Sequence, residues 1–192
     1  MRFEPGARMI LEAILLTVAK ISANGDAKLP VAVLPQMQVD TGPDDGICII
    51  NPATKFQVWL TGHIDYGLCT YGCKSYQDRV LNAAAHDIIR FTCKCITLAK
   101  GKHEECLYDS MPKAVSQAMA LNEVKKKKAV RFCLLNGQHW IFSLLIKDKQ
   151  GKLVLYEGEK FTIIEPRPDM PSLFQHSVHK VVELVYHWVS LN

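Results

Sequence analysis

One carboxylate lies where a predicted β-strand enters the body of the domain. Asp65 is part of the segment LTGHIDYGL (residues 60–68), between apolar residues and glycines, and follows the alternating segment KFQVW. An unpaired buried charge is costly, so this carboxylate needs a cation, a metal ion or backbone N–H donors as partners. His63 lies two residues earlier, on the same face of a strand, as a hydrogen-bond partner of Asp65 or as a ligand of an ion softer than Mg²⁺.

A run of four lysines, Lys125, Lys126, Lys127 and Lys128, follows a predicted helix. Cations suit a helix C-terminus, so one interpretation is a solvated helix end. The other interpretation is a patch that contacts the phosphates of a nucleic acid. The net charge of +4 at pH 7 permits a nucleic-acid partner but does not require one.

Seven cysteines are present, an odd number, and most of them lie in apolar, strand-like stretches. This usage indicates a reduced intracellular protein with buried thiols. The pairs Cys69-x3-Cys73 and Cys93-x-Cys95 raise the question of a zinc site, but their spacing does not match the common C-x2-C pairs. We therefore expect no zinc site.

Length and composition indicate one globular domain. The chain has 192 residues, of which 48% are hydrophobic and 22% charged, as in ordinary soluble proteins. The segment MILEAILLTVAKI is the one candidate for targeting, but Glu12 interrupts it and Lys20 closes it. It is too short for a membrane span. We expect a core-facing helix, no membrane partner and a cytoplasmic or nuclear protein.

Apolar spacing and turn residues predict an α/β domain with a central mixed β-sheet flanked by helices. Asn136-Gly137 between two apolar runs predicts a β-hairpin, and Trp140 and Phe142 on its second strand are expected in the core rather than stacked on a base. The predicted helices cover residues 8–22, 110–124 and 172–190, and the predicted strands include residues 47–50, 56–68, 88–100, 129–135 and 139–148.

Four segments in this order carry a resemblance to a known fold: HIDYGL (63–68), IIRFTCK (88–94), AVSQAMAL (114–121) and VRFCLLNGQHWIFSLL (130–145). The order of helix, strand, Asp-bearing strand, Lys-bearing strand, helix and strand resembles the PD-(D/E)XK (restriction-endonuclease-like) fold. It is similar to a large group of mostly uncharacterised fungal proteins with a nuclease-like core. The resemblance implies one nuclease-like domain over residues 1–192, with its core at about residues 8–160.

The resemblance also implies a chemistry. In that family an Asp and a Glu on adjacent strands hold Mg²⁺ through oxygen ligands, and a Lys two residues after the Glu assists the attacking water. Asp65 matches the metal-binding position, and Lys94 matches the lysine position. Gln117 matches a polar position on the central helix that could touch a phosphate or the water, or could face solvent.

The family pattern is broken at one position. Thr92 stands where the motif has Glu, and a hydroxyl is a poorer Mg²⁺ ligand than a carboxylate. Without the Glu, Asp65 and Lys94 could instead form an ion pair across adjacent strands. A replacement carboxylate could come from elsewhere in the chain, and the candidates are Glu12, Asp78, Asp87 and Glu104.

Two functions from different classes follow from the resemblance. The first is a degenerate PD-(D/E)XK-like domain, weakly active or inactive, that binds DNA or RNA, or a protein partner. The second is an active Mg²⁺-dependent phosphodiesterase that uses Asp65, Lys94 and a carboxylate from elsewhere, with Lys125 to Lys128 on the phosphates. Fold analogy is an associational argument for either function.

Overall fold

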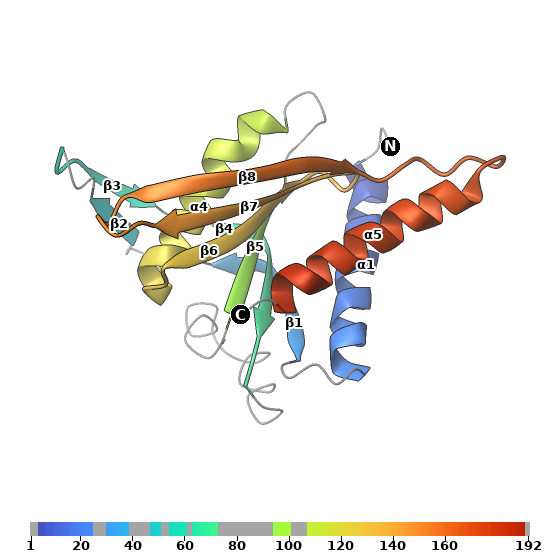
Figure 1. Cartoon of the computed structure of the whole chain (residues 1–192), viewed down its shortest axis with the longest axis horizontal. Coiled ribbons are helices and arrows are strands. Elements are labelled where there is room, and N and C mark those ends of the chain that lie inside the picture. Colours follow the sequence, from blue (N-terminus) through green and yellow to red (C-terminus); the bar gives the residue numbers. More distant parts are fainter. Residues whose placement is uncertain are drawn as a thin grey trace.

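The computed structural model contains a six-stranded sheet with helices on both faces (Figure 1). It describes residues 4–24, 30–38, 47–50, 54–60, 63–72, 94–100 and 107–190. The helices are α1 (Glu4–Asn24), α4 (Met111–Lys125) and α5 (Pro171–Ser190), with a short 3₁₀ turn at Tyr108–Ser110 before α4. The strands are β1 (Val31–Gln38), β2 (Ile47–Ile50), β3 (Gln57–Leu60), β4 (His63–Thr70), β5 (Lys94–Lys100), β6 (Ala129–Leu135), β7 (His139–Lys147) and β8 (Leu153–Thr162).

The strand order in the main sheet is β1-β4-β5-β6-β7-β8. All neighbours are antiparallel except β5 and β6, which are parallel and are connected through α4. A parallel pair needs a long crossover connection, and the helix supplies it. The predicted α/β class with a mixed sheet flanked by helices is confirmed, while the PD-(D/E)XK core remains a prediction.

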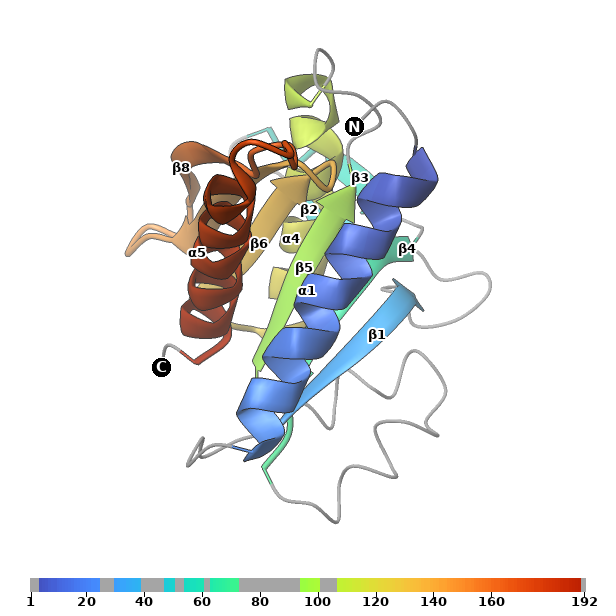
Figure 2. The ribbon, with the colours of Figure 1, turned by 90° about the vertical axis from the view of Figure 1, so that its right-hand side faces the viewer.

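Two hydrophobic cores cover the two faces of the sheet. Figure 2 shows α1 and α5 in front of the sheet and α4 behind it. On β6 the side chains alternate between these cores: Phe132 and Leu134 pack toward α4, whereas Cys133 and Leu135 pack toward α1 and α5. The core under α1 and α5 includes Leu11, Ile14, Leu15, Val18, Trp140, Phe142, Val181, Val185 and Val189. The predicted core role of Trp140 is confirmed, since its side chain is fully buried and stacks on Phe142.

The segment of residues 56–68 is not one long strand, contrary to the prediction. Its first part is β3, which pairs with β2 in a separate two-stranded sheet, and its second part is β4 in the main sheet. The β2–β3 hairpin packs on α4, with Ile47 buried against the core. Apolar alternation alone predicts a strand but not the sheet to which it belongs, so the break was not visible in the sequence.

The edge strand β1 is distorted next to Asp65. Gln36 has a left-handed backbone with φ of 50°, and it lies between the register pairs Pro35–Tyr66 and Met37–Ile64, which places it opposite Asp65. The distortion changes the alternation of faces, so that Leu34 and Met37, three residues apart, belong to the same core. Pro35 also lies in this strand, and an edge strand tolerates proline because it does not need every backbone N–H for pairing.

None of the described helices is both long enough and apolar enough to cross a membrane. The helix predicted at residues 8–22 is found as α1, and the one predicted at residues 172–190 is found as α5. The predicted hairpin is also found, with Gly137 at φ of 92° in the turn between β6 and β7.

Candidate functional site

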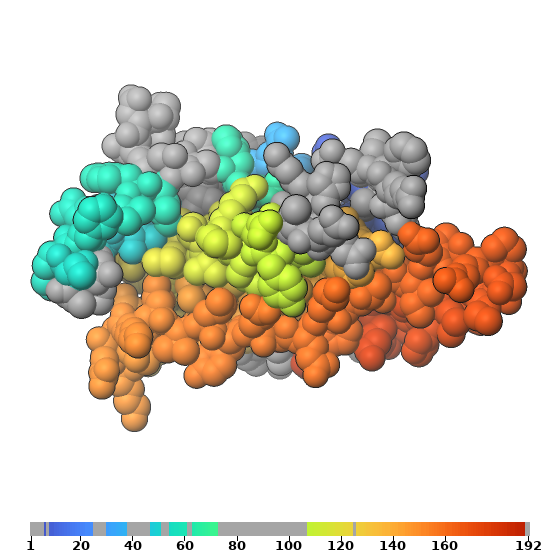
Figure 3. All heavy atoms as spheres, turned by 90° about the horizontal axis from the view of Figure 1, so that it is seen from above, coloured from blue at the N-terminus to red at the C-terminus, as the bar shows by residue number. Residues whose placement is uncertain are grey.

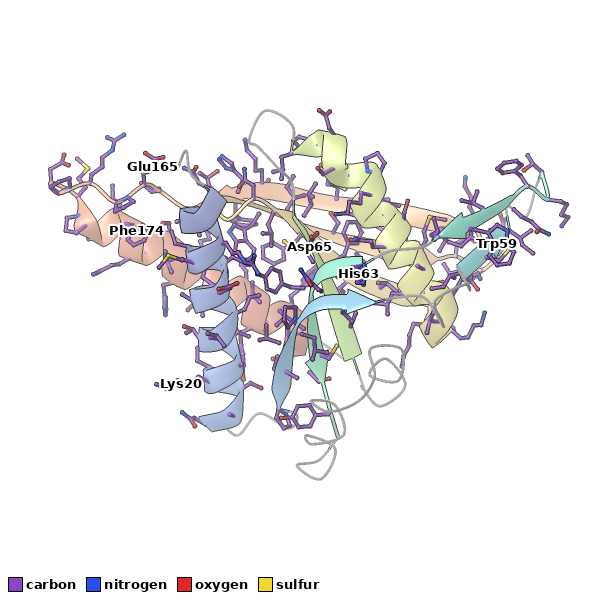
Figure 4. All side chains as sticks on the ribbon, turned by 180° about the vertical axis from the view of Figure 1, so that it is seen from behind. Lys20, Trp59, His63, Asp65, Glu165 and Phe174 are labelled. Carbon is purple, nitrogen blue, oxygen red and sulfur yellow. The ribbon has the colours of Figure 1, made fainter. Side chains whose placement is uncertain are left out.

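Asp65 lies at the beginning of β4, partly exposed, beside the first turn of α4. Lys113 on α4 places its Nζ 3.4 Å from Oδ2 of Asp65, and the two side chains are 54% and 32% exposed. Figure 4 shows Asp65 and His63 together at this end of β4. A pair this exposed contributes little to stability, on the order of 0–1 kcal/mol. Its local effect is to place a positive charge beside the carboxylate on which the metal prediction rests.

Gln117 lies one helical turn after Lys113, on the same face of α4. Its Nε2 donates a hydrogen bond to the carbonyl oxygen of His63 at 2.7 Å, which joins α4 to the beginning of β4. Its Oε1 is buried and has no hydrogen-bond partner within the described part of the chain. The structure thus places Gln117 next to the Asp-bearing strand, and its Oε1 can still accept a hydrogen bond.

Lys94 does not face Asp65 across the sheet. In the register of β4 and β5, Lys94 lies opposite Thr70, and Tyr66 lies opposite Leu98. Five residues separate Thr70 from Asp65, which is about 17 Å along an antiparallel strand. The predicted cross-strand ion pair between Asp65 and Lys94 is therefore wrong; Lys113, a lysine that does reach Asp65, comes from α4. A catalytic role of Lys94 remains a prediction, and Thr92 lies outside the described residues.

Continuing the same register brings the end of β5 next to Asp65. The pair Tyr66–Leu98 is the last of the β4–β5 ladder, so the backbone of Ala99 comes beside Asp65, followed by Lys100, which pairs with Leu135 of β6. Neither Lys113 nor Lys100 was singled out in the sequence. An antiparallel register depends on loop lengths and packing that a single sequence does not reveal.

Glu12, one candidate for a replacement carboxylate, is on the other face of the sheet. Its Oε1 accepts hydrogen bonds from Tyr66 Oη and Arg8 Nε, each at 2.9 Å. The Arg8 hydrogen bond, followed by that of Tyr66, lowers the pKa of Glu12. Tyr66 packs in the core under α1, whereas Asp65 contacts α4. Glu12 is therefore no partner for Asp65, and Asp78, Asp87 and Glu104 lie outside the described residues.

Lys126, Lys127 and Lys128 of the predicted lysine run form one wall of a pocket of about 430 Å³, and Lys125 is not part of the described lining. Helix α4 ends at Lys125, and Lys126 turns the chain with a left-handed backbone at φ of 50°. Asn122 Nδ2 then donates a hydrogen bond to the carbonyl of Lys127 at 2.6 Å, and the N–H of Lys147 donates to the carbonyl of Lys128 at 2.8 Å. These bonds fix the lysine run against the end of β7.

Two further lysines line the same pocket, Lys147 and Lys149. We call Lys126, Lys127, Lys128, Lys147 and Lys149 the lysine cluster. The hairpin at Asn136-Gly137 returns the end of β7 to the beginning of β6, where Ala129 pairs with Ile146. The predicted hairpin therefore carried a signal that these two residues lie near the lysine run.

The two carboxylates in this pocket are already engaged. Glu123 lies 2.9 Å from Nζ of Lys126 and 3.6 Å from Nζ of Lys147, and Lys126 in particular lowers the pKa of Glu123. Asp148 Oδ1 accepts backbone hydrogen bonds from Gln150 and Lys152 in the β7–β8 turn. Within the described part of the chain, the remaining three lysines of the cluster, Lys127, Lys128 and Lys149, form no ion pair. The pocket therefore keeps an excess of positive charge.

No protein-family model matches this sequence, and no curated protein is significantly similar to it. Among the described residues, no group of three or more His, Cys, Asp or Glu side chains is close enough together to hold a metal ion.

Proposed function

We propose that the protein is a degenerate PD-(D/E)XK-like module, weakly active or inactive as a nuclease, that binds the phosphate backbone of DNA or RNA through the lysine cluster. The fold part of this proposal is supported by the order α1, β1, β4, β5, α4 and β6, which is the order on which the resemblance rests. The parallel pair β5–β6 around α4 is also compatible with it. Both are arguments by analogy.

The proposed loss of activity is supported by three observations. Thr92 replaces the motif Glu, Lys113 is paired with Asp65, and the first residue of β5, Lys94, is opposite Thr70 rather than Asp65. Mg²⁺ needs several oxygen ligands, usually with more than one carboxylate or phosphate among them. The described residues offer it a single carboxylate that is already next to a cation, so by themselves they do not fit a Mg²⁺ site.

The observation that carries the binding function is the lysine cluster. Its three lysines that form no ion pair with a described residue belong to two segments, residues 126–128 and 147–149, that meet at one pocket. Neutralising phosphates releases condensed counterions, and this gives affinity without sequence specificity. A solvated helix end explains Lys125 to Lys128 alone, but not the convergence of Lys147 and Lys149 on the same pocket.

The test is binding of fluorescently labelled single-stranded DNA, duplex DNA and RNA, measured by polarisation over a range of salt concentrations. Lys127→Glu/Lys128→Glu is compared with Lys20→Glu/Lys160→Glu, which changes the charge equally at exposed residues outside the pocket. We expect the cluster variant to lose at least about tenfold in affinity, and the salt slope to fall by about two. Equal binding by both variants, or no salt-dependent binding by the wild type, would overturn the proposal.

One observation favours the second candidate, the Mg²⁺-dependent phosphodiesterase. Asp65 keeps a 32% exposed side chain, and Gln117 Oε1, on the neighbouring turn of α4, is an oxygen without a partner in the described part of the chain. Activity would then need a carboxylate from Asp78, Asp87 or Glu104. Hydrolysis of a labelled oligonucleotide that requires Mg²⁺ and disappears in Asp65→Ala would favour this candidate.

A further inference from the structure

A second pocket, larger and mostly apolar, adjoins the lysine cluster. This groove of about 810 Å³ lies between the β2–β3 hairpin, α4 and the β7–β8 turn. Its apolar lining includes Ile50, Phe56 and Val58 from the hairpin, Met119 from α4 and Leu153 from β8. Figure 3 shows the hairpin, α4 and the β7–β8 end of the sheet side by side at this end of the molecule. The volume is in the range of sites that hold a ligand or a peptide side-chain cluster.

The hairpin residues that line the groove have large apolar side chains that are exposed to solvent. Ile50, Phe56 and Val58 are 54%, 68% and 43% exposed. Ile47 and Leu60, on the same face of the hairpin as Val58, attach the hairpin to α4. Exposed apolar side chains gathered in one concave place are typical of a binding surface, whereas single ones are ordinary.

The charge around the groove selects the partner. Lys147 and Lys152 line the groove, and Glu123, the one carboxylate among the described lining residues, is paired with Lys126 and Lys147. The groove shares Glu123, Lys147 and Gly151 with the pocket that the lysine cluster lines, so the apolar groove adjoins that positively charged pocket directly. Complementarity therefore favours an occupant that carries negative charge.

The lining also distinguishes a peptide from a nucleic acid. Proteins that hold unpaired bases present aromatic rings on which the bases stack, but among the described residues that line this groove Phe56 is the one aromatic residue. Aliphatic and methionine side chains instead fit the apolar anchors of a peptide segment. We propose that the groove binds an acidic, amphipathic segment of a partner protein, with its apolar side chains in the groove and its carboxylates on the lysines.

This second site does not depend on the proposed function, but it shares lysines with it. An acidic segment that reaches Lys147 and the lysine cluster occupies the cations that phosphates would use. The partner segment and a nucleic acid are therefore expected to compete for these lysines. The apolar groove itself contributes affinity only for the peptide.

The test begins with selection of random peptides, displayed on phage, on the wild-type protein. Selected peptides are synthesised, and their affinities are measured by calorimetry for Val58→Asp and Trp59→Asp. Val58 lines the groove, whereas its neighbour Trp59 is 62% exposed and is not part of the lining. We expect acidic peptides with spaced apolar residues, at least about tenfold weaker binding to Val58→Asp, and unchanged binding to Trp59→Asp.

Controls separate this proposal from the previous one. Circular dichroism and thermal unfolding check that the variants fold, and Phe56→Asp, at a 68% exposed side chain, replaces Val58→Asp if that variant unfolds. Val58 does not line the pocket of the lysine cluster, so Val58→Asp should still bind oligonucleotides. Loss of peptide binding with normal oligonucleotide binding therefore distinguishes this site from the lysine cluster. Selection of no peptide, selection of neutral or basic peptides, or equal binding to the Val58 and Trp59 variants would overturn the inference.

Discussion

The ammonium of Lys113 lies 3.4 Å from the carboxylate of Asp65, so helix α4 supplies a cation at this site. Gln117, on the next turn of the same helix, holds the carbonyl of His63. The beginning of β4 is therefore attached to α4 through two polar contacts on successive helical turns. This arrangement gives Asp65 a structural role without a metal ion.

Metal binding is the first property that this arrangement predicts. Because Lys113 competes with a cation for Asp65, calorimetric titration with Mg²⁺ and Mn²⁺ should give no saturable binding that depends on Asp65. Wild type and Asp65→Ala should therefore behave alike. Lys113→Met removes the competing charge but leaves the carboxylate, and it tests whether the lysine is what prevents binding. Saturable binding by the wild type that is lost in Asp65→Ala would contradict the prediction and indicate a carboxylate from the residues outside the described ranges.

Gln117 should matter for stability more than its partial exposure suggests. In Gln117→Glu a carboxylate replaces the donor and faces the His63 carbonyl, which Nε2 now contacts at 2.7 Å. We expect a loss of about 1–3 kcal/mol at neutral pH, measured by urea unfolding. The repulsion raises the pKa of the new carboxyl in the folded state, so the variant should recover stability as the pH falls and the protonated group donates again. Ser116→Ala is the neighbouring control, because the Ser116 hydroxyl donates a hydrogen bond within α4 to the carbonyl of Pro112.

Glu12 predicts a pH dependence of stability. The hydrogen bonds from Arg8 and Tyr66 lower the pKa of Glu12 in the folded state. A lowered pKa contributes stability that is present above the unfolded pKa of about 4.3 and is lost as the pH falls through the folded pKa. Glu12→Gln removes this contribution.

The measurement is thermal unfolding from about pH 6 to about pH 2, across the range in which glutamates titrate. The wild type should lose more stability toward acid pH than Glu12→Gln does. Glu157→Gln, at an exposed residue of β8, should follow the wild-type curve. Parallel curves for the wild type and Glu12→Gln would show that the hydrogen bonds of Glu12 with Arg8 and Tyr66 make no net contribution to the pH dependence of stability.

Local signals in the sequence predicted most elements but not their pairing. The turn at Asn136-Gly137 and the helix at residues 172–190 were predicted because turn chemistry and apolar periodicity are local. The division of residues 56–68 between two sheets was missed, since it depends on how the β2–β3 hairpin packs on α4.

The candidate site was predicted only in part, for the same reason. Asp65, Gln117 and the lysine run were identified by residue type, and the structure places Gln117 beside the Asp-bearing strand. The prediction that Lys94 is the partner of Asp65 was wrong, because that pairing depends on the β4–β5 register. Lys147 was missed as a member of the lysine cluster. The antiparallel pairing of β6 and β7 brings it next to Lys128, which is distant in the sequence.

Lys126 allows a test of whether the lysine cluster is kept for function at a cost in stability. It follows the last residue of α4 with a left-handed backbone, φ 50° and ψ 37°, a conformation in which glycine is the favoured residue. Lys126→Gly should relieve this strain and stabilise the protein by up to about 1 kcal/mol, reduced by the loss of the exposed contact with Glu123. The same change removes one cation and frees the Glu123 carboxylate toward the pocket, so oligonucleotide affinity should fall.

The decisive comparison is with Lys126→Asn, because asparagine also tolerates the left-handed conformation but has an uncharged polar side chain. Chemical unfolding and polarisation of a labelled oligonucleotide are measured for both variants. Greater stability together with weaker binding in both would mean that the charge at this helix end is retained for a polyanion. Weaker binding without any gain in stability would mean that the Glu123 contact offsets the backbone strain. Unchanged binding in both would remove Lys126 from the binding surface and leave the lysine run a solvated helix end.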